Sequence, residues 1–596
     1  MDNQRNLIVA IALSFLLLVG WTSAMDYFYP QPEAALVGGK ADTPSEQAAV
    51  SDADPSATRH TRTGGLADPA LRAEEEADLE TALATPDRVR IDAPRVAGSI
   101  NLRGAVIDDV VLKDHMEGTG DESQPVRLFS PNGTPAQQFA QFGYLINGSR
   151  IADDAVWQAD GRVLTQDTPV TLTHDLGDGI TATIRYAIDD DYMFTVEQSV
   201  ANTGADPAVV QPYGYVNRTS RTASQDLWIA HSGPIGVFAD AADYDVDYDD
   251  VDEAQTVSPA GRASWAGFTD IYWLAALVPQ DGAAPATTFR ALGNETYRAD
   301  MIYDAVTLPA GKALSTSSRL YAGAKESVVL DRYEDAGLQK FGLAIDWGWF
   351  RWFEKPFLWL LRNIYEAVGN FGIAIMILTL IVRGAMFPIA QKGFASMASM
   401  KAIQPKMKAI QEKYKDDKQV QQQKIMELYK TEKVNPVAGC LPMLLQIPVF
   451  FALYKVLVLG IEMRHREFLW IKDLAAPDPA NLANALSLVG IEVPQFLMIV
   501  FGLGVLAVLL GFTMWLTFKL NPSAMDPMQQ QIFNIMPWIL MFVMAPFAAG
   551  LLLYWVTSNV LTLAQQKYLY SKHPQMRAMI EEEKAKKAAE AAAKAG

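Results

Sequence analysis

The sequence predicts a polytopic α-helical membrane protein with one large all-β domain on the outer side of the membrane. Apolar runs at the start of the chain and in its last third are the first observation, since about 20 apolar residues span a bilayer. Between them, Met25 to Arg332 is strongly acidic and rich in alternating β-branched and aromatic residues. Lysines gather in only some of the connecting segments, as expected of cytoplasmic ones.

Charge divides the chain into two parts. Its 596 residues are too many for a single core, and half of them are apolar. Met25 to Arg332 carries a net charge of −25 and the remainder +7, which indicates two compartments. Cys440 is the single cysteine, so no intramolecular disulfide can form and stability has to come from apolar cores.

The first apolar run, Leu7 to Met25, follows Arg5 and predicts an N-terminal transmembrane anchor over residues 1–25. A cleaved signal peptide is the alternative, because Thr22-Ser23-Ala24 loosely suits a peptidase. Residues 26–86 are rich in Ala, Pro, Ser, Thr and acidic residues, with few large apolar ones. Such a segment buries too little surface to offset chain entropy, so we expect a flexible acidic linker.

Residues 87–332 show period-two alternation, for example in TATIRYAI and YMFTVEQSV, and predict a β-sandwich. The acidic run Asp243 to Glu253 has two interpretations. Clustered oxygens suit calcium, but Tyr248 stands where an EF-hand loop needs glycine, so a solvated loop is the default. No HExxH, GxSxG or Walker pattern occurs and the six histidines lack ligand spacing, so we expect no enzyme activity, metal or cofactor.

Residues 333–356 predict an amphipathic helix lying in the outer membrane interface. Apolar residues recur there at intervals of three and four: Leu338, Phe341, Ile345, Trp349 and Trp352. The segment is too polar to span, and its tryptophans suit headgroup depth. The alternative is a helix packed on the β domain.

Residues 357–570 predict a membrane core with five further spans. These are about Phe371–Ala390, Val437–Leu459, Val493–Leu516, Ile532–Met544 and Pro546–Leu563. Residues 391–433 hold ten lysines against five acids, whereas Ile461 to Glu492 holds three basic residues against five acids. The positive-inside rule then places both termini in the cytoplasm and the β domain outside.

The cytoplasmic segment 391–435 predicts an antiparallel helical hairpin. Its apolar seam would consist of Met397, Met400, Met407, Ile410 and Met426. Methionine adapts to varied partners, so a docking site for unlike hydrophobic segments and a self-contained hairpin are equally compatible with the pattern. The lysines here and in the basic tail, residues 571–596, could attract ribosomal RNA or anionic lipid.

Arg383 lies within the second span, nine residues before Lys392. This places its charge roughly 13 Å inside the cytoplasmic end, where burial is costly. The side chain could simply reach back to the headgroups. However, other spans also carry polar residues: Thr379, Gln446, Tyr554, Ser558 and Asn559. Such groups avoid lipid, so we expect them to line a hydrated cavity that receives polypeptide from the cytoplasm and releases it sideways, as in an insertase.

Several ordered motifs from Gly342 to Tyr570 resemble the YidC/Oxa/Alb family of membrane protein insertases. They are LTLIVRGAMFPIA, MKAIQPKMKAIQEKYKDDKQ, EKVNPVAGCLPMLLQIPVFFALYKVL, FLWIKDLAAPDP, DPMQQQIFNIMP and GLLLYWVTSN. The resemblance implies a bacterial inner-membrane protein with a five-helix insertase core, an uncleaved anchor and a periplasmic β-supersandwich. It also implies action on nascent membrane proteins, alone or beside the SecYEG translocon, without a nucleotide.

The resemblance further implies roles for individual residues. Arg383 corresponds to the groove arginine, and Thr379 and Gln446 to groove-lining positions. Tyr554 and Trp555 mark the helix that contacts substrate, although relatives often have Tyr where this chain has Trp555. The tail is short, so contact with the ribosome through it would be weak.

Two other classes of function compete with the insertase. An ion or solute transporter usually shows repeated halves or an intramembrane acid as coupling partner, and the spans supply no obvious one. A membrane-anchored carbohydrate-active or binding protein would rest on the β domain alone. Deleting most of that domain would abolish activity in this last class but be largely tolerated by an insertase.

Overall fold

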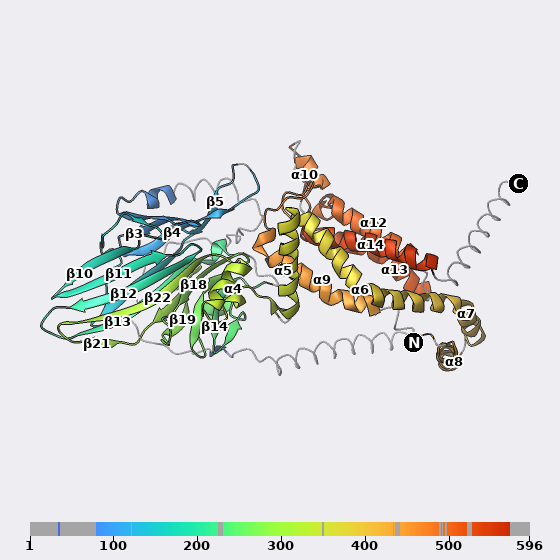
Figure 1. The fold of residues 1–596 in the computed structure, drawn as a ribbon, viewed down its shortest axis with the longest axis horizontal. Coiled ribbons are helices and arrows are strands. Elements are labelled where there is room, and N and C mark those ends of the chain that lie inside the picture. Colours follow the sequence, from blue (N-terminus) through green and yellow to red (C-terminus); the bar gives the residue numbers. More distant parts are fainter. Residues whose placement is uncertain are drawn as a thin grey trace. The chain divides into compact units, whose positions relative to one another are not determined.

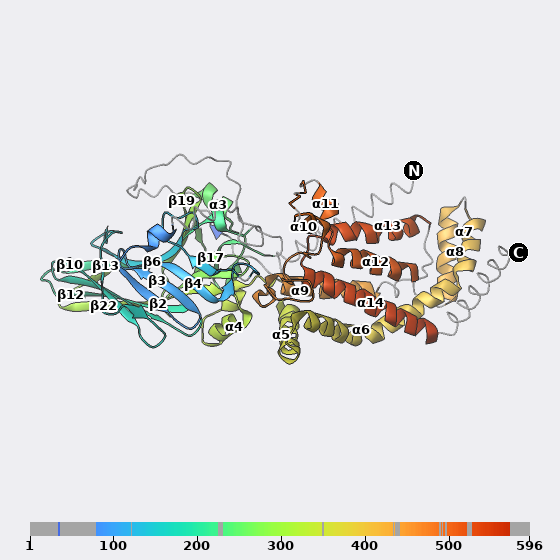
Figure 2. The same ribbon diagram turned by 90° about the horizontal axis from the view of Figure 1, so that it is seen from above.

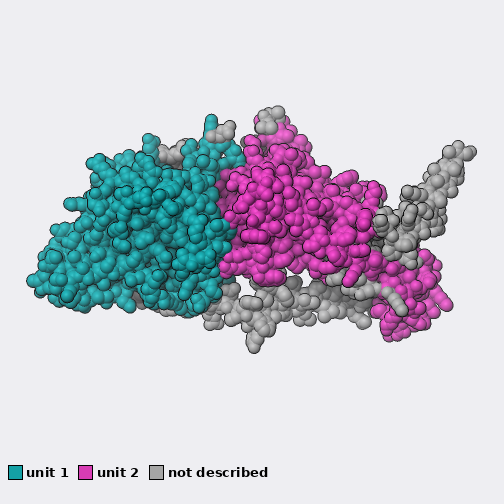
Figure 3. Space-filling view, viewed as in Figure 1, with its two compact units in different colours: residues 1–346 teal, residues 347–596 magenta. Residues whose placement is uncertain are grey.

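The computed structural model describes residues 34–35, 79–120, 122–224, 230–348, 351–415, 417–432, 434, 441–487, 490–491, 493–494, 497–520 and 527–572. The chain divides into two compact units, Met1–Asp346 and Trp347–Gly596, which Figure 3 colours separately. The anchor predicted over 1–25, most of the linker predicted over 26–86 and the tail after residue 572 lie outside the described residues.

The first unit contains two β-sheets, which confirms the predicted all-β domain (Figure 1). Over the described residues the larger sheet has 13 strands. Its main path runs β1 (Ala34–Ala35), β16 (Thr256–Pro259), β19 (Ala286–Gly293), β20 (Thr296–Ile302), β13 (Ala208–Thr219), β6 (Gln138–Ile146), β4 (Val106–Met116), β3 (Val96–Asn101), β2 (Arg88–Asp92) and β9 (Val163–Leu164). Strands β21 (Val306–Leu308), β5 (Pro125–Phe129) and β7 (Ser149–Arg150) pair with β13, β4 and β6.

The smaller sheet has nine strands over the described residues. Its order is β15 (Ala241–Asp243), β14 (Gly233–Phe238), β17 (Ala263–Thr269), β18 (Trp273–Val278), β22 (Lys312–Ala324), β12 (Met193–Asn202), β11 (Ile180–Ile188), β10 (Val170–Gly177) and β8 (Gln158–Ala159). In β11 every second residue is buried, as the alternation in ITATIRYAI predicts. The hydroxyl of Tyr144 from β6 donates to the carbonyl of Thr183 in β11 over 2.8 Å, so the core lies between the sheets.

The acidic run that predicted a loop forms a short helix, α3 (Tyr248–Ala254). The side chain of Asp247 accepts from the backbone N–H of Asp250, and the Asp250 carboxylate accepts from Asp247 in return. This capping box satisfies the first turn, while Tyr248 and Val251 are buried. Apolar anchoring at two positions therefore makes the run helical in spite of its charge.

The amphipathic helix predicted over 333–356 is not a continuous helix. Helix α4 ends at Asp335 (Ser327–Asp335), Gly337 and Lys340 have positive φ, and a 3₁₀ turn, η2 (Phe341–Ala344), follows. The prediction was wrong because the ring of Phe341 packs among three aromatic rings of the first unit, Trp265, Tyr321 and Tyr333. The first unit accordingly extends to Asp346, beyond the boundary predicted at 332.

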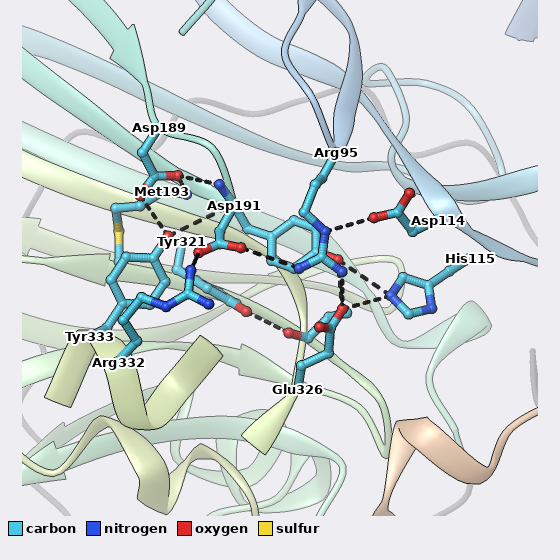
Figure 4. A network of polar contacts seen from close by, with 12 residues as sticks. Arg95, Asp114, His115, Asp189, Asp191, Met193, Tyr321, Glu326, Arg332 and Tyr333 are labelled. Carbon is cyan, nitrogen blue, oxygen red and sulfur yellow. Dashed lines mark hydrogen bonds and ion pairs between the residues drawn. The ribbon is translucent and has the colours of Figure 1, made fainter. Parts of the chain in front are cut away.

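A network of charged groups connects α4 to both sheets (Figure 4). Arg95 pairs with Glu326 and also contacts Asp114 at 2.7 Å and Asp191 at 3.2 Å. Glu326 accepts a 2.8 Å hydrogen bond from the hydroxyl of Tyr192 and lies 3.0 Å from His115. Although burial raises the pKa of Glu326, hydrogen bonds from His115 and Arg95 outweigh it and hold the pKa at about 2.

Lys325, between β22 and α4, is buried, and its ammonium donates to the hydroxyl of Thr269 over 2.9 Å. Burial lowers the pKa of Lys325 from 10.5 to about 7, and the nearby charge of Arg218 lowers it further. The carboxylates of Asp270 and Asp346 act in the opposite direction but do not outweigh burial. The unfolded chain therefore binds more protons than the folded chain between these two pH values. Stability should rise as the pH increases from about 7 toward 10.5.

Replacing Lys325 with methionine should remove this pH dependence and stabilise the first unit at pH 7 and below. The gain should be a few kcal/mol, since one pKa unit corresponds to about 1.4 kcal/mol. The stability of the first unit is measured by urea denaturation of the full chain in detergent at pH 6, 7.5 and 9, with proteolysis as the readout of unfolding. An unchanged slope of stability against pH in the Met variant would show that Lys325 is not the group responsible.

The second unit is helical (Figure 2). Its helices are α5 (Arg351–Val368), α6 (Phe371–Ala402), α7 (Gln404–Lys413), α8 (Lys418–Thr431), α9 (Leu441–Leu459), α10 (Leu482–Ser487), α11 (Met498–Phe501), α12 (Val505–Leu520), α13 (Pro527–Met544) and α14 (Ala549–Lys572), with a 3₁₀ turn, η5 (Ile461–Met463). Among the described residues one segment, Phe371–Gly393, is long and apolar enough to cross a membrane. Leu444–Leu459, Val505–Lys519 and Asn534–Met544 are shorter apolar segments.

The fourth predicted span, Val493–Leu516, is interrupted. Helix α11 ends at Phe501 and α12 begins at Val505. The backbone N–H of Leu506 donates to the carboxylate of Asp478 over 2.7 Å, and Gly504 leaves room for that side chain. An acid from the preceding loop therefore caps α12 and sets where this helix begins.

Candidate functional site

Helix α14 lies at the centre of the second unit and packs against α6, α9 and α12. Arg383 projects from α6 toward α14, where its Nε donates to the hydroxyl of Ser558 over 3.0 Å and a terminal nitrogen donates to the same oxygen. Within the described residues no carboxylate lies within 4.0 Å of the guanidinium. In the described part of the chain, a neutral hydroxyl therefore holds this cation.

A second polar contact joins α9 to α14 beside the first. The amide nitrogen of Gln446 donates to the hydroxyl of Tyr554, which is buried one turn before Ser558 on α14. Gln446, Tyr554, Ser558 and Arg383 thus form two neighbouring polar pairs across three helices, called here the polar chain. The amide oxygen of Gln446 is buried without a partner among the described residues. An unsatisfied acceptor of this kind favours a polar ligand or water nearby.

The other predicted residues of this site point elsewhere. Thr379, one turn before Arg383, is 1 % exposed, and its hydroxyl donates to the carbonyl of Ile375. Asn559 donates to the hydroxyl of Thr513 in α12 over 3.1 Å. The ring of Trp555 lies 5.0 Å from that of Phe450 in α9. The structure thus brings four of the seven predicted residues together.

Two family models match this chain. The 60Kd inner membrane protein model matches residues 363–576, which include the polar chain, and the YidC periplasmic domain model matches residues 88–360. A membrane protein insertase YidC from Beijerinckia indica subsp. indica is 40% identical over 95% of this chain and 96% of its own. The chain belongs to the YidC membrane protein insertase family.

A second relative agrees with this assignment. The membrane protein insertase YidC of Zymomonas mobilis subsp. mobilis is 41% identical over 96% of both chains. A solved structure of an active YidC insertase with its first transmembrane domain resolved is 18% identical, covers 85% of this chain and 98% of its own, and has a TM-score of 0.34. The chain is an inner-membrane protein with a periplasmic domain, and its relatives support membrane protein insertase function.

Sequence reasoning missed two residues that continue the polar chain along α14. Thr562 and Gln566 follow Tyr554 and Ser558 at intervals of four, so all four lie on one stripe of the helix. Gln566 is 2 % exposed, and its amide oxygen has no partner among the described residues. The four-residue spacing from Tyr554 was the available signal, but polar residues near the end of a span are common.

The hairpin predicted over 391–435 contains α7 and α8, which lie side by side beyond the C-terminal end of α6 (Figure 2). Asp417 caps α8 by accepting from the backbone N–H groups of Gln419 and Val420. Met407 is buried, and its sulfur accepts from the hydroxyl of Tyr429, whereas Met426 is 58 % exposed. Met400 is half-buried on α6, and the side chain of Met397 lies outside the described residues.

The residues predicted for an interfacial helix are divided between the two units. Phe341 belongs to the first unit, Trp349 lies outside the described residues, and Trp352 lies on α5. Trp352 and Trp359 are 73 % and 65 % exposed, and they share one face of α5 because they are seven residues apart. Helix α5 is therefore the amphipathic element of this part of the chain.

Proposed function

We propose that this chain inserts nascent hydrophobic polypeptides into the bacterial inner membrane by receiving them at the polar chain around Arg383. The observation that carries the proposal is the contact of Arg383 with Ser558, which holds the cation with a neutral hydroxyl. A guanidinium paired with a carboxylate would have its charge neutralised within the protein. A cation held by a hydroxyl keeps its attraction for an acidic or polar segment of an incoming chain.

The surface next to the polar chain suits the release of an apolar segment. Leu380 and Ile381 on α6 precede Arg383 and are 56 % and 44 % exposed. Leu445 and Ile447 flank Gln446 on α9 and are 39 % and 45 % exposed. A substrate whose polar part contacts Arg383 would thus have lipid-facing apolar side chains within one helical turn. Its own apolar part can then move sideways into the bilayer without crossing a polar barrier.

The topology and partners form part of the same proposal. Both termini and the α7–α8 hairpin lie in the cytoplasm, and the β domain lies in the periplasm, as the positive-inside rule indicates. Substrates are nascent membrane proteins, received in a hydrophilic groove open to the cytoplasm and delivered alone or through the SecYEG translocon, with a weak ribosome contact. Insertion is not an enzymatic reaction here and needs no nucleotide, metal or cofactor, because partition into lipid supplies the driving force.

Photo-crosslinking tests the contact directly. A photoreactive residue at Gln446 or Gln566 should crosslink to a nascent membrane protein stalled on the ribosome. The matched control is Val560, which is 50 % exposed on α14 but is turned about 200° away from Ser558, so a photoreactive residue there should crosslink mainly to lipid. Crosslinks to the nascent chain that are equally strong at Val560 and at the two glutamines would contradict a defined polar path.

A further inference from the structure

A strained turn lies in the loop between α9 and α10. Phe468 and Ile471 exchange backbone hydrogen bonds of 2.8 and 2.9 Å, which leaves Leu469 and Trp470 at the tip. Leu469 has φ 54, a conformation that costs a leucine about 1 kcal/mol or more. Leu469 is 76 % exposed and Trp470 40 % exposed. The turn thus exposes two large apolar side chains, which is unfavourable in water, and it holds Leu469 in a strained backbone conformation.

The turn is attached firmly to the first residues of α6. The ring of Phe468 packs on Gly372, where a Cβ atom would lie 2.1 Å from the ring. Asn370 caps α6 by accepting from Ile373, and its side-chain nitrogen donates to the carbonyl of Glu467 over 3.2 Å. Because α6 contains the segment Phe371–Gly393, the tip lies at the level where an apolar span begins.

A second attachment fixes the orientation of the tip. The indole N–H of Trp470 donates to the carboxylate of Asp478 over 2.9 Å, and that carboxylate also caps α12. The polar edge of Trp470 therefore faces the protein, while Leu469 has no such contact. A tryptophan whose N–H is satisfied at one edge suits the boundary between water and lipid.

Charges beside the tip complement a lipid surface. Arg466 and Lys472 are exposed on either side of it, against the exposed acid Glu467. The guanidinium of Arg466 also lies over the rings of Tyr365 and Phe371, 5.7 Å from each centroid. Cations at this depth attract anionic headgroups, and their stems cover apolar rings.

We infer that Leu469 and Trp470 insert into the headgroup and upper acyl region of the outer leaflet, where they anchor the outer end of α6. The partner is phospholipid, because the tip lies at the same depth as the first residues of the α6 span and has cations on either side. The inference rests on the topology proposed above, which places this end of α6 on the periplasmic side. It does not depend on substrate contact with Arg383.

Spin labelling in vesicles of phosphatidylethanolamine and phosphatidylglycerol tests the anchor. Leu469→Cys is made in a Cys440→Ser background and labelled with a nitroxide, with Asn484→Cys on α10 as the matched exposed control. At 469 the nitroxide should collide more with oxygen and less with a water-soluble nickel complex than at 484. Lys472→Cys provides an intermediate position that should lie nearer the water.

Two results would overturn the anchor. Equal access of the nickel complex at 469 and 484 would place the tip in water, and exclusion of both quenchers at 469 would indicate a protein partner instead. Insertion of a model substrate by the same labelled samples is measured in parallel. Active samples with a water-exposed tip would refute the anchor alone, whereas inactive samples with a lipid-buried tip would count against the proposed function alone.

Discussion

Replacing Arg383 with alanine should reduce the insertion of substrates with acidic translocated tails roughly tenfold or more. The estimate follows because a hydrogen bond to a charged group contributes about 1.5 to 3 kcal/mol, and 1.4 kcal/mol is a factor of about ten. The protein itself should not lose stability. Arg383 is held by Ser558 without a carboxylate among the described residues, so its removal relieves a costly charge in an apolar bundle.

Two control variants separate charge from packing at this position. Arg383→Lys keeps the charge and should retain more activity than alanine, because charge contributes more here than the planar geometry of guanidinium. Ser558→Ala removes the hydroxyl that holds the guanidinium but leaves the charge, so it should also be milder. Insertion of a substrate with an acidic tail and of a matched neutral one is measured beside thermal unfolding in detergent. Equal losses for both substrates, or a loss that tracks unfolding, would contradict a role of the charge.

Replacing Arg95 with alanine should destabilise the β domain by about 1.5 to 3 kcal/mol, the usual contribution of hydrogen bonds to charged groups. The cost stays below that of breaking a fully buried pair, because the network is partly exposed and water screens the charges that remain. Arg95 contacts Asp114, Asp191 and Glu326, and its guanidinium lies 4.5 Å from the centroid of the Tyr192 ring. Arg332 still pairs with Asp191, and His115 with Glu326, so the network should weaken without disappearing.

A surface ion pair provides the control for Arg95. Arg221 lies 2.9 Å from Glu295, and both side chains are more than a third exposed. Its replacement by alanine should cost about 1 kcal/mol or less. Urea titrations of the full chain, read by proteolysis of the β domain, compare the two variants. Similar midpoints for Arg95→Ala and Arg221→Ala would show that the network in Figure 4 contributes no more than a surface pair.

The sequence identified the polar residues of the membrane unit but not their pairing. Arg383, Gln446, Tyr554 and Ser558 could be selected because a polar side chain in an apolar span is costly unless it meets a partner. From the sequence, Ser558 and the adjacent Asn559 were equally suitable as the partner of Arg383. One residue along a helix turns the side chain by about 100°, so Ser558 meets Arg383 while Asn559 meets Thr513 on α12. Which neighbour stands on each side is a property of the packed bundle.

In the segment after the β domain, the sequence indicated which residues avoid water but not where they are buried. Its apolar residues recur with helical spacing, yet Leu338, Phe341 and Ile345 are buried in the first unit. Periodicity records which residues avoid water, not the surface that covers them. The pocket that accepts Phe341 is formed by Trp265, Tyr321 and Tyr333, which are brought together only by strand pairing and by α4.

The sequence by itself determined the class of this protein: an acidic β domain in two sheets, an apolar helical unit, and a cation placed where lipid would exclude it. These features follow from local composition and periodicity, which each stretch of chain carries alone. Tertiary structure decided that a serine hydroxyl holds Arg383, that an acid from a distant loop caps α12, and that Leu469 is displayed on a strained turn. Each of these depends on contacts between residues far apart in the chain, whose distances only the folded packing sets.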